Sequence, residues 1–200
     1  MNAQALHPRA LLLACAVQPG DPASLALAGV IGAAFAEHGM QWLPLTGLSA
    51  AATRAVMDRR FPGADAALGL DWLALDGAER PEPRQDEVDD LVALLLDHLS
   101  PAAGPAEDGR AVAHALACAS LGGNHLWQDL FLPSRRELSA LIGGWFPALA
   151  ARNTGDMKWK KFFYKQLCER EQIFVCKSPS CGVCTDHGLC FGPEEGSARI

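Results

Sequence analysis

Helical spacing of apolar residues is the feature that most constrains how this 200-residue chain can fold. Apolar side chains recur at intervals of three and four positions along most of the sequence, and this spacing places them on one face of an α-helix. The only convincing strand pattern is the short run at 173–175, and strands do not alternate with helices. The sequence therefore predicts an all-α domain that resembles a helical bundle.

Several segments combine this spacing with signals for the start and end of a helix. Residues 22–39 carry an apolar stripe that starts at a proline and stops at a glycine, and the serine at the head of 49–60 is a good N-cap. Residues 86–99 show the most regular apolar stripe, and the Ala-rich segment 107–121 is followed by two glycines. Each of these four segments is predicted to be a helix.

The clearest helix start follows Pro133. Ser134 and Glu137 have the spacing of a capping box, in which the hydroxyl and the carboxylate accept hydrogen bonds from free backbone amides. Pro147 lacks an amide hydrogen and should end or kink this helix. A last helix is predicted at 156–170, with a buried face formed by Trp159, Phe162, Phe163 and Leu167.

The domain organisation follows from where the helical pattern stops. Polar stretches rich in Pro, Gly and Ala at 76–86 and 100–109 are expected to be surface loops inside one domain. Half of the residues are hydrophobic, which is enough for one core. We expect a helical domain at 1–170 and, packed on it, an irregular cysteine-rich tail at 171–200 that binds a metal cluster.

Charge and cysteine content exclude several classes of partner. The net charge of −6 argues against nucleic acid, and no apolar run approaches the roughly 18 residues of a membrane span. Seven cysteines, an odd number, do not suit a secreted disulfide framework. The apolar run at 10–14 is shorter than the roughly 7 to 15 residues of a signal peptide core. We therefore expect a cytoplasmic protein that binds neither nucleic acid nor membrane.

Four cysteines near the C-terminus have the spacing C-x4-C-x2-C-x5-C: Cys176, Cys181, Cys184 and Cys190. Thiolates this close repel one another unless a cation or cluster neutralises them, and bound metal would order a segment that has little to pack. Structural zinc sites usually have two C-x2-C pairs, and this motif has one. Iron–sulfur sites often place three cysteines in a short run. The spacing favours an iron–sulfur cluster and leaves zinc open.

The other cysteines have a simpler interpretation. Cys15 and Cys118 lie among apolar residues, where a thiol behaves as a small hydrophobic group. Cys168, at the end of the last predicted helix, is expected to be a core residue, with a transient ligand role as the alternative. His125 follows a pair of glycines and is expected to cap a helix or to have another structural role.

Two residues inside the motif are further candidate ligands. Asp186 and His187 lie between the third and fourth cysteines, and either side chain could take a coordination position that sulfur leaves open. Simple exposure to solvent is the alternative for both. On the last predicted helix, four lysines form a basic patch that would favour a nearby anionic cluster or oxyanion: Lys158, Lys160, Lys161 and Lys165.

Five segments together resemble the NifQ family of nitrogen-fixing bacteria. The similarity is strong over the C-terminal part of the chain and loose over the first hundred residues, and Phe131 stands where a small residue is expected. The segments are NHLWQDL (124–130), LPSRREL (132–138), FPALAARN (146–153), MKWKKFFYKQLCE (157–169) and CFGPEE (190–195).

The resemblance implies a carrier, not an enzyme, that supplies molybdenum for the iron–molybdenum cofactor of nitrogenase. The four cysteines would hold an iron–sulfur cluster of the 3Fe–4S or 4Fe–4S type that incorporates molybdenum. The implied partners are the cofactor assembly scaffold, the nitrogenase reductase, and molybdate or another molybdenum source. Two alternatives remain open: a zinc-stabilised protein-interaction module and a small iron–sulfur electron-transfer protein.

Overall fold

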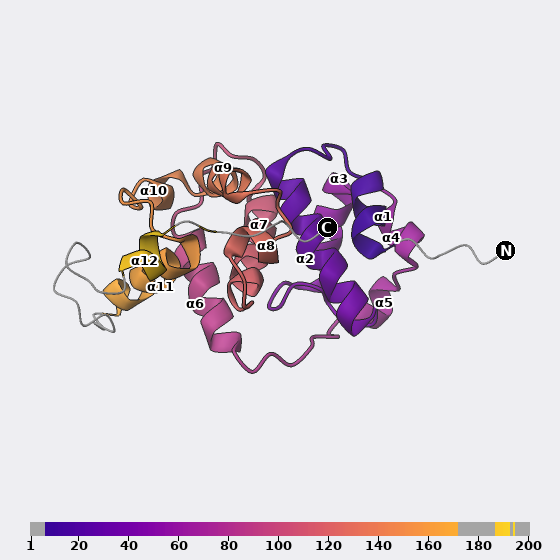
Figure 1. Cartoon of the computed structure of the whole chain (residues 1–200). Helices are drawn as coiled ribbons and strands as arrows, with labels where there is room; N and C mark the ends of the chain where they lie inside the picture. Colours follow the sequence, from indigo (N-terminus) through magenta and orange to yellow (C-terminus); the bar gives the residue numbers. More distant parts are fainter. Residues whose placement is uncertain (1–6, 172–186, 193, 195–200) are drawn as a thin grey trace.

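The computed structural model describes residues 7–171, 187–192 and 194, and over these residues the chain is helical without a strand (Figure 1). The predicted all-α class is therefore confirmed, whereas the predicted strand at 173–175 lies outside the described residues. No described helix is both long and apolar enough to cross a bilayer. The helices are α1 (Pro8–Ala14), α2 (Pro22–His38), α3 (Ala50–Arg60), α4 (Ala64–Leu68), α5 (Trp72–Leu75), α6 (Gln85–Leu96), α7 (Ala106–Ser120), α8 (Leu126–Asp129), α9 (Arg135–Trp145), α10 (Pro147–Ala150), α11 (Trp159–Arg170) and α12 (His187–Phe191).

Helix α7 lies at the centre of the described part of the molecule. It packs against α2, α3, α6 and α8, and nearly all of its residues after the first turn are buried. Its many alanines let neighbouring helices approach closely on several sides. Figure 1 shows α1 to α5 gathered on one side of α7, and α9 to α12 on the other.

Helix α2 has nearly the bounds that the sequence predicts. Its N-cap is Asp21, whose carboxylate accepts a hydrogen bond from the Ser24 amide at 3.1 Å. It packs against α1, a short helix that the sequence did not predict. Gly32 makes this contact possible, because a Cβ at that position would lie 2.6 Å from the Arg9 backbone. Leu12 of α1 is fully buried as a result.

Local signals fixed several helix ends. Ser49 caps α3 and α9 ends before Pro147, both as predicted, and Pro147 begins the short helix α10, which was not predicted. Ser134 caps α9 through the Arg136 amide at 3.1 Å. However, the Glu137 carboxylate accepts a hydrogen bond from the Ser134 hydroxyl, and among the described residues no hydrogen bond joins it to the Ser134 backbone amide. The predicted capping box is therefore only half formed.

Helix α11 begins at Trp159, later than predicted. Asp156 has a φ of 53°, a left-handed conformation that a helix cannot include, and Lys158 is the N-cap. Trp159, Phe162 and Phe163 are buried as predicted, and their rings pack edge to face or tilted with centroids 5.7 to 6.2 Å apart. The predicted fourth member, Leu167, is only half-buried, whereas Gln166 is buried.

One buried ion network joins three helices. Asp108 of α7 is 4 % exposed and accepts from Arg59 Nε and Arg60 Nε, each at 2.8 Å. Arg60 Nη1 also donates to Asp21 at 2.7 Å. Both carboxylates are therefore paired, which is the condition for burying charge at low cost.

Candidate functional site

The predicted cluster ligands are only partly within the described residues. Cys190 lies on α12, whereas Cys176, Cys181, Cys184 and Asp186 lie outside the described residues. Over the described ranges, no three His, Cys, Asp or Glu side chains gather closely enough to hold a metal ion. The four-cysteine ligand set therefore stays a prediction.

Helix α12 is held against the start of α11. The Lys158 amide donates to the Cys190 carbonyl at 2.7 Å, and Lys158 Nζ donates to the Gly188 carbonyl at 3.4 Å. Cys190 is half-buried and packs against the main core. The exposed His187 ring stacks on Phe191, with centroids 4.5 Å apart. These contacts bring the last cysteine of the motif to the surface of the helical body.

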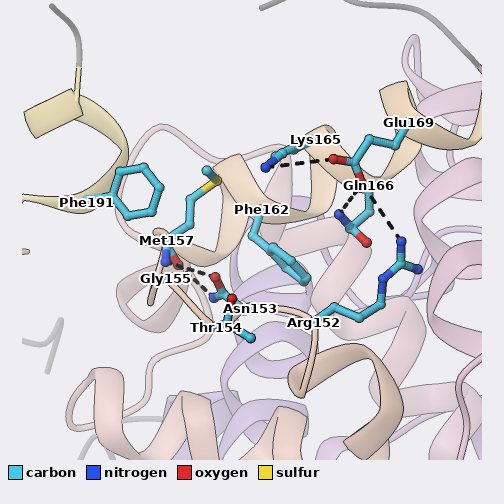
Figure 2. A pocket seen from close by; sticks show the side chains of 10 residues that line it. All are labelled: Arg152, Asn153, Thr154, Gly155, Met157, Phe162, Lys165, Gln166, Glu169 and Phe191. Atoms are coloured by element: carbon cyan, nitrogen blue, oxygen red, sulfur yellow. Dashed lines mark hydrogen bonds and ion pairs between the residues drawn. The ribbon is translucent and has the colours of Figure 1, made fainter. Parts of the chain in front are cut away.

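A pocket of about 290 Å³ lies beside α12 (Figure 2). Phe191 stands at one edge, and Phe162 and Gln166 line the pocket from α11. Gln166 Nε2 donates to Glu169 at 2.8 Å, while its buried Oε1 has no hydrogen-bond partner among the described residues. The Glu169 carboxylate also lies 3.8 Å from an Arg152 nitrogen. The pocket thus combines an aromatic side with a polar rim.

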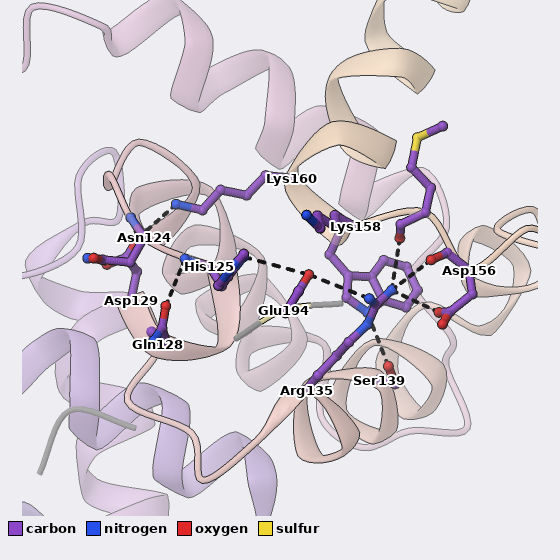
Figure 3. A network of polar contacts seen from close by, with 12 residues as sticks. Asn124, His125, Gln128, Asp129, Arg135, Ser139, Asp156, Lys158, Lys160 and Glu194 are labelled. Carbon is purple, nitrogen blue, oxygen red and sulfur yellow. Dashed lines mark hydrogen bonds and ion pairs between the residues drawn. The ribbon is translucent and has the colours of Figure 1, made fainter. Parts of the chain in front are cut away.

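A buried carboxylate anchors the chain just beyond Cys190 (Figure 3). The Glu194 side chain is 5 % exposed, and its Oε1 lies 3.6 Å from Arg135 Nη1 and 3.9 Å from His125 Nδ1. Its Oε2 is buried without a hydrogen-bond partner in the described ranges. The cysteine segment is therefore fixed to the body on both sides of residue 192, at Cys190 and at Glu194.

Arg135 is itself held in place by the turn that precedes α11. Its Nη2 donates to the Asp156 carbonyl at 2.9 Å, to the Asp156 carboxylate at 2.8 Å and to the Met157 carbonyl at 3.1 Å. Asn153 closes the same turn through two hydrogen bonds with the Met157 backbone, at 2.8 and 2.9 Å. The Arg135 guanidinium that faces Glu194 is therefore held in a fixed orientation by hydrogen bonds to the turn itself.

A second ion pair lies beside this network. Lys160 Nζ donates to Asp129 Oδ2 at 2.7 Å and to the Gly122 carbonyl at 2.8 Å. Burial by itself would raise the pKa of Asp129, but the hydrogen bonds from Lys160 and Asn124 outweigh it and hold the pKa below its usual value. The carboxylate and the ammonium therefore neutralise each other.

The predicted basic patch is not one open face. Lys158 and Lys160 have the partners given above, and Lys165 lies 3.7 Å from Glu169. Lys161 is exposed on α11. Most of the positive charge of this helix is therefore used in local contacts.

Sequence reasoning missed Glu194, Arg135 and Asp129 as interacting groups. All three lie in segments that carry the family resemblance, but no spacing rule connects residues so far apart in the chain. His125 is the N-cap of α8, as expected of a structural histidine, and its backbone amide donates to Gln128 Oε1 at 3.1 Å. Its contact with Glu194 was not predicted.

The remaining cysteines behave largely as expected. Cys15 and Cys118 are half-buried and pack against the core. Burial raises the pKa of the Cys118 thiol, which keeps it protonated and unreactive. Cys168 is half-buried on α11, and its role stays a prediction.

These observations define a class: an all-α protein with a cysteine motif near its C-terminus, the last cysteine of which is anchored to the helical body. The family model described as NifQ matches residues 26–192. The chain therefore belongs to the NifQ family, whose name associates it with nitrogen fixation.

Individual relatives agree with this assignment. Protein NifQ of Rhodobacter capsulatus is 38% identical over 154 residues, which cover 76% of this chain and 79% of the relative. Protein NifQ of Azotobacter vinelandii is 50% identical over 113 residues, and the match spans only 56% of each chain. The NifQ homolog of Sinorhizobium fredii is 39% identical over 155 residues, 76% of this chain and 63% of that protein. No solved structure matches this chain.

Proposed function

We propose that this protein carries molybdenum on an iron–sulfur cluster and supplies it for assembly of the iron–molybdenum cofactor of nitrogenase. Cys176, Cys181, Cys184 and Cys190 hold the cluster, which is cargo and not a catalytic centre. The observation that supports this most is the extent of the family match, which runs through residue 192 and so includes all four cysteines. The protein then acts as an accessory carrier and not as an enzyme.

The donor set suits such a cargo. Four cysteine thiolates are the usual ligands of a 4Fe–4S cluster, three can hold a 3Fe–4S unit, and thiolate sulfur also suits other soft metal centres. Cys190 is only partly buried, and the neighbouring Leu189 side chain is 65% exposed. A cluster bound at this surface position is accessible to a docking partner, which transfer requires. The partners proposed are the cofactor assembly scaffold and the nitrogenase reductase.

The metal inventory of the protein tests this proposal. The full chain is purified without oxygen, and iron, acid-labile sulfide, molybdenum and zinc are measured together with visible absorption and electron paramagnetic resonance. A carrier should contain iron and sulfide, with molybdenum below one atom per chain after growth on molybdate. The variant Cys118→Ala, which removes a core thiol and no proposed ligand, is the matched control and should keep the same inventory.

The same measurement separates the alternatives. One zinc per chain and no visible colour would identify a zinc-stabilised interaction module and contradict the carrier. Iron and sulfide with a reversible redox potential, and no molybdenum under any growth condition, would identify an electron-transfer protein.

A further inference from the structure

The Glu194 carboxylate is buried in a pocket formed by Arg135 and His125 that holds it loosely. Its closest nitrogens there, Arg135 Nη1 and His125 Nδ1, lie 3.6 and 3.9 Å away, both beyond a normal hydrogen bond, whereas Lys160 and Asp129 meet at 2.7 Å in the same region. One of its two oxygens has no partner in the described part of the chain. A buried carboxylate normally makes several close hydrogen bonds, because desolvation without them is costly. The pocket therefore does not fit this carboxylate closely.

The donors of this pocket converge from separate elements. His125 stands at the N-cap of α8 and Arg135 at the first position of α9, and both face the same point, Glu194 Oε1. The Arg135 guanidinium is fixed by Asp156 and Met157, so that its Nη1 is directed without further ordering. Figure 3 shows Lys158 beside Glu194, whereas Lys160 is directed toward Asp129.

We propose that His125 and Arg135 form a binding site for a tetrahedral oxyanion, and that the Glu194 carboxylate occupies this site when the oxyanion is absent. A tetrahedral dianion has four oxygens, so one oxygen can accept from the Arg135 guanidinium while another lies against the His125 ring. It also carries twice the charge of the carboxylate that it replaces. Arginine in a fixed geometry is well suited to such an anion.

Occupation of this site is coupled to the cysteine segment. Glu194 and the oxyanion compete for the same donors, so that oxyanion binding releases the anchor just beyond Cys190. By thermodynamic linkage, anything that holds Glu194 in place weakens oxyanion binding by the same factor. The site therefore places an incoming oxyanion beside the cysteine motif and loosens that motif at the same time. The choice of molybdate among tetrahedral oxyanions rests on the proposed function, whereas the pocket itself does not.

Molybdate binding to the metal-free full chain tests the inference, with equilibrium dialysis as the measurement. Glu194→Gln removes the competing charge and keeps the size of the side chain. It should bind molybdate roughly tenfold more tightly than the unaltered chain, because a tethered competitor acts at an effective concentration in the millimolar range. Arg135→Gln should abolish binding, and His125→Gln should weaken it.

The matched control is Glu107→Gln. Glu107 also lies 3.9 Å from an arginine nitrogen, on Arg59, but its side chain is 62% exposed. This variant should bind molybdate like the unaltered chain. Equal affinity of Glu194→Gln and Glu107→Gln, or no binding to either, would overturn the inference. The comparison of Glu194→Gln with Glu107→Gln tests for a gain of affinity, which a misfolded protein cannot show. The test therefore remains valid even if Arg135→Gln fails to fold.

Hydrogen exchange supplies a readout that a purely structural ion pair would not change. The amides of α12 should exchange faster when molybdate is added to the unaltered chain, and Glu194→Gln should show this faster exchange without molybdate. Exchange that molybdate leaves unchanged would contradict the competition.

Two further experiments distinguish failure of this inference from failure of the proposed function. A variant with serine at Cys176, Cys181 and Cys184 should still bind molybdate, even though it cannot hold a cluster. Loss of molybdate binding in this variant would count against a separate oxyanion site. Sulfate and phosphate that bind as tightly as molybdate, with the same gain in Glu194→Gln, would support the pocket and count against molybdenum as its cargo.

Discussion

Asp129 shows how one pair of neighbours sets the charge of a side chain. Its side chain is only 10% exposed, yet hydrogen bonds from Lys160 and Asn124 keep its pKa below the usual 3.8. A carboxyl group with a lowered pKa in the folded state stabilises the fold above about pH 4, and this contribution is lost as the pH falls through the folded-state pKa.

Asp129→Asn should therefore lower the free energy of unfolding by about 1 kcal/mol near pH 7, the low end for a charged hydrogen bond because solvent partly screens the pair. The difference from the unaltered chain should be smaller at pH 3 than at pH 7, because the carboxyl group is progressively protonated as the pH falls. Urea unfolding at both pH values measures this. Asp97→Asn removes a 62% exposed carboxylate paired with Arg170 and should change little at either pH. An equal loss at both pH values for Asp129→Asn would contradict the pKa shift.

Phe131 shows why a small residue is expected at its position. Its φ is 57°, a left-handed conformation that glycine adopts without strain. The ring compensates by lying under the Arg9 guanidinium, 5.6 Å from its centroid, and Arg9 also donates to the Phe131 carbonyl at 3.2 Å. Arg9 therefore contacts both the ring and the carbonyl of Phe131.

The conformation of Phe131 gives a stability prediction. Phe131→Gly and Phe131→Ala both lose the ring, but only glycine relieves the left-handed backbone. Phe131→Gly should therefore be more stable than Phe131→Ala by about 1 kcal/mol. Chemical denaturation of the two variants measures the difference. An alanine variant that equals or exceeds the glycine variant would show that the backbone rearranges when the ring is lost.

At the scale of elements, close approach of helices depends on single glycines. A Cβ at Gly32 of α2 would lie 2.6 Å from the Arg9 backbone of α1, whereas a Cβ at Gly144 of α9 would meet nothing within 4 Å. The two positions have the same local helix propensity and opposite tertiary surroundings.

The pair Gly32→Ala and Gly144→Ala tests this contrast. Gly32→Ala should destabilise the protein by about 1 to 3 kcal/mol, because α1 must move away from α2. Gly144→Ala should stabilise it by about 0.5 to 1 kcal/mol through helix propensity. Thermal unfolding followed by circular dichroism measures both. If both variants are stabilised, α1 does not pack on α2 as described.

At the scale of the whole molecule, one buried core unites most of the described helices. The buried cluster runs from Leu12 to Phe163, and of the four cysteines only Cys190 is described as packing against it. A division into a helical domain at 1–170 and a cysteine-rich tail at 171–200 remains a prediction consistent with this core.

Cysteine substitutions test the division. Cys176→Ala, Cys181→Ala and Cys184→Ala should each abolish cluster retention, because these three form the closely spaced C-x4-C-x2-C part of the motif, and should leave the helical circular dichroism signal largely intact. Cys190→Ala should lose molybdenum and keep some iron, since three sulfurs can still hold a three-iron unit. Metal analysis and circular dichroism measure the two effects. Global unfolding on loss of any one motif cysteine would show that the chain is not divided in this way.

Short-range signals in the sequence predicted much of the fold. Helices α2, α3, α6, α7 and α9 were expected close to their observed bounds, because apolar spacing, caps, prolines and glycines act within a few residues. The motif of four cysteines is likewise visible as spacing alone. For the same reason, the sequence by itself determined the all-α class, and it predicts the chemical type of the candidate site.

Only the tertiary structure decided which distant groups meet. Packing of α8 against α9, together with the segment after α12, brings His125, Arg135 and Glu194 together, and no local pattern encodes such a contact. The delayed start of α11 depends on the turn held by Arg135, and the burial of Asp108 depends on two arginines of α3. Helix formation is governed by neighbours along the chain, whereas a binding pocket is governed by side chains that become neighbours only after the helices have packed.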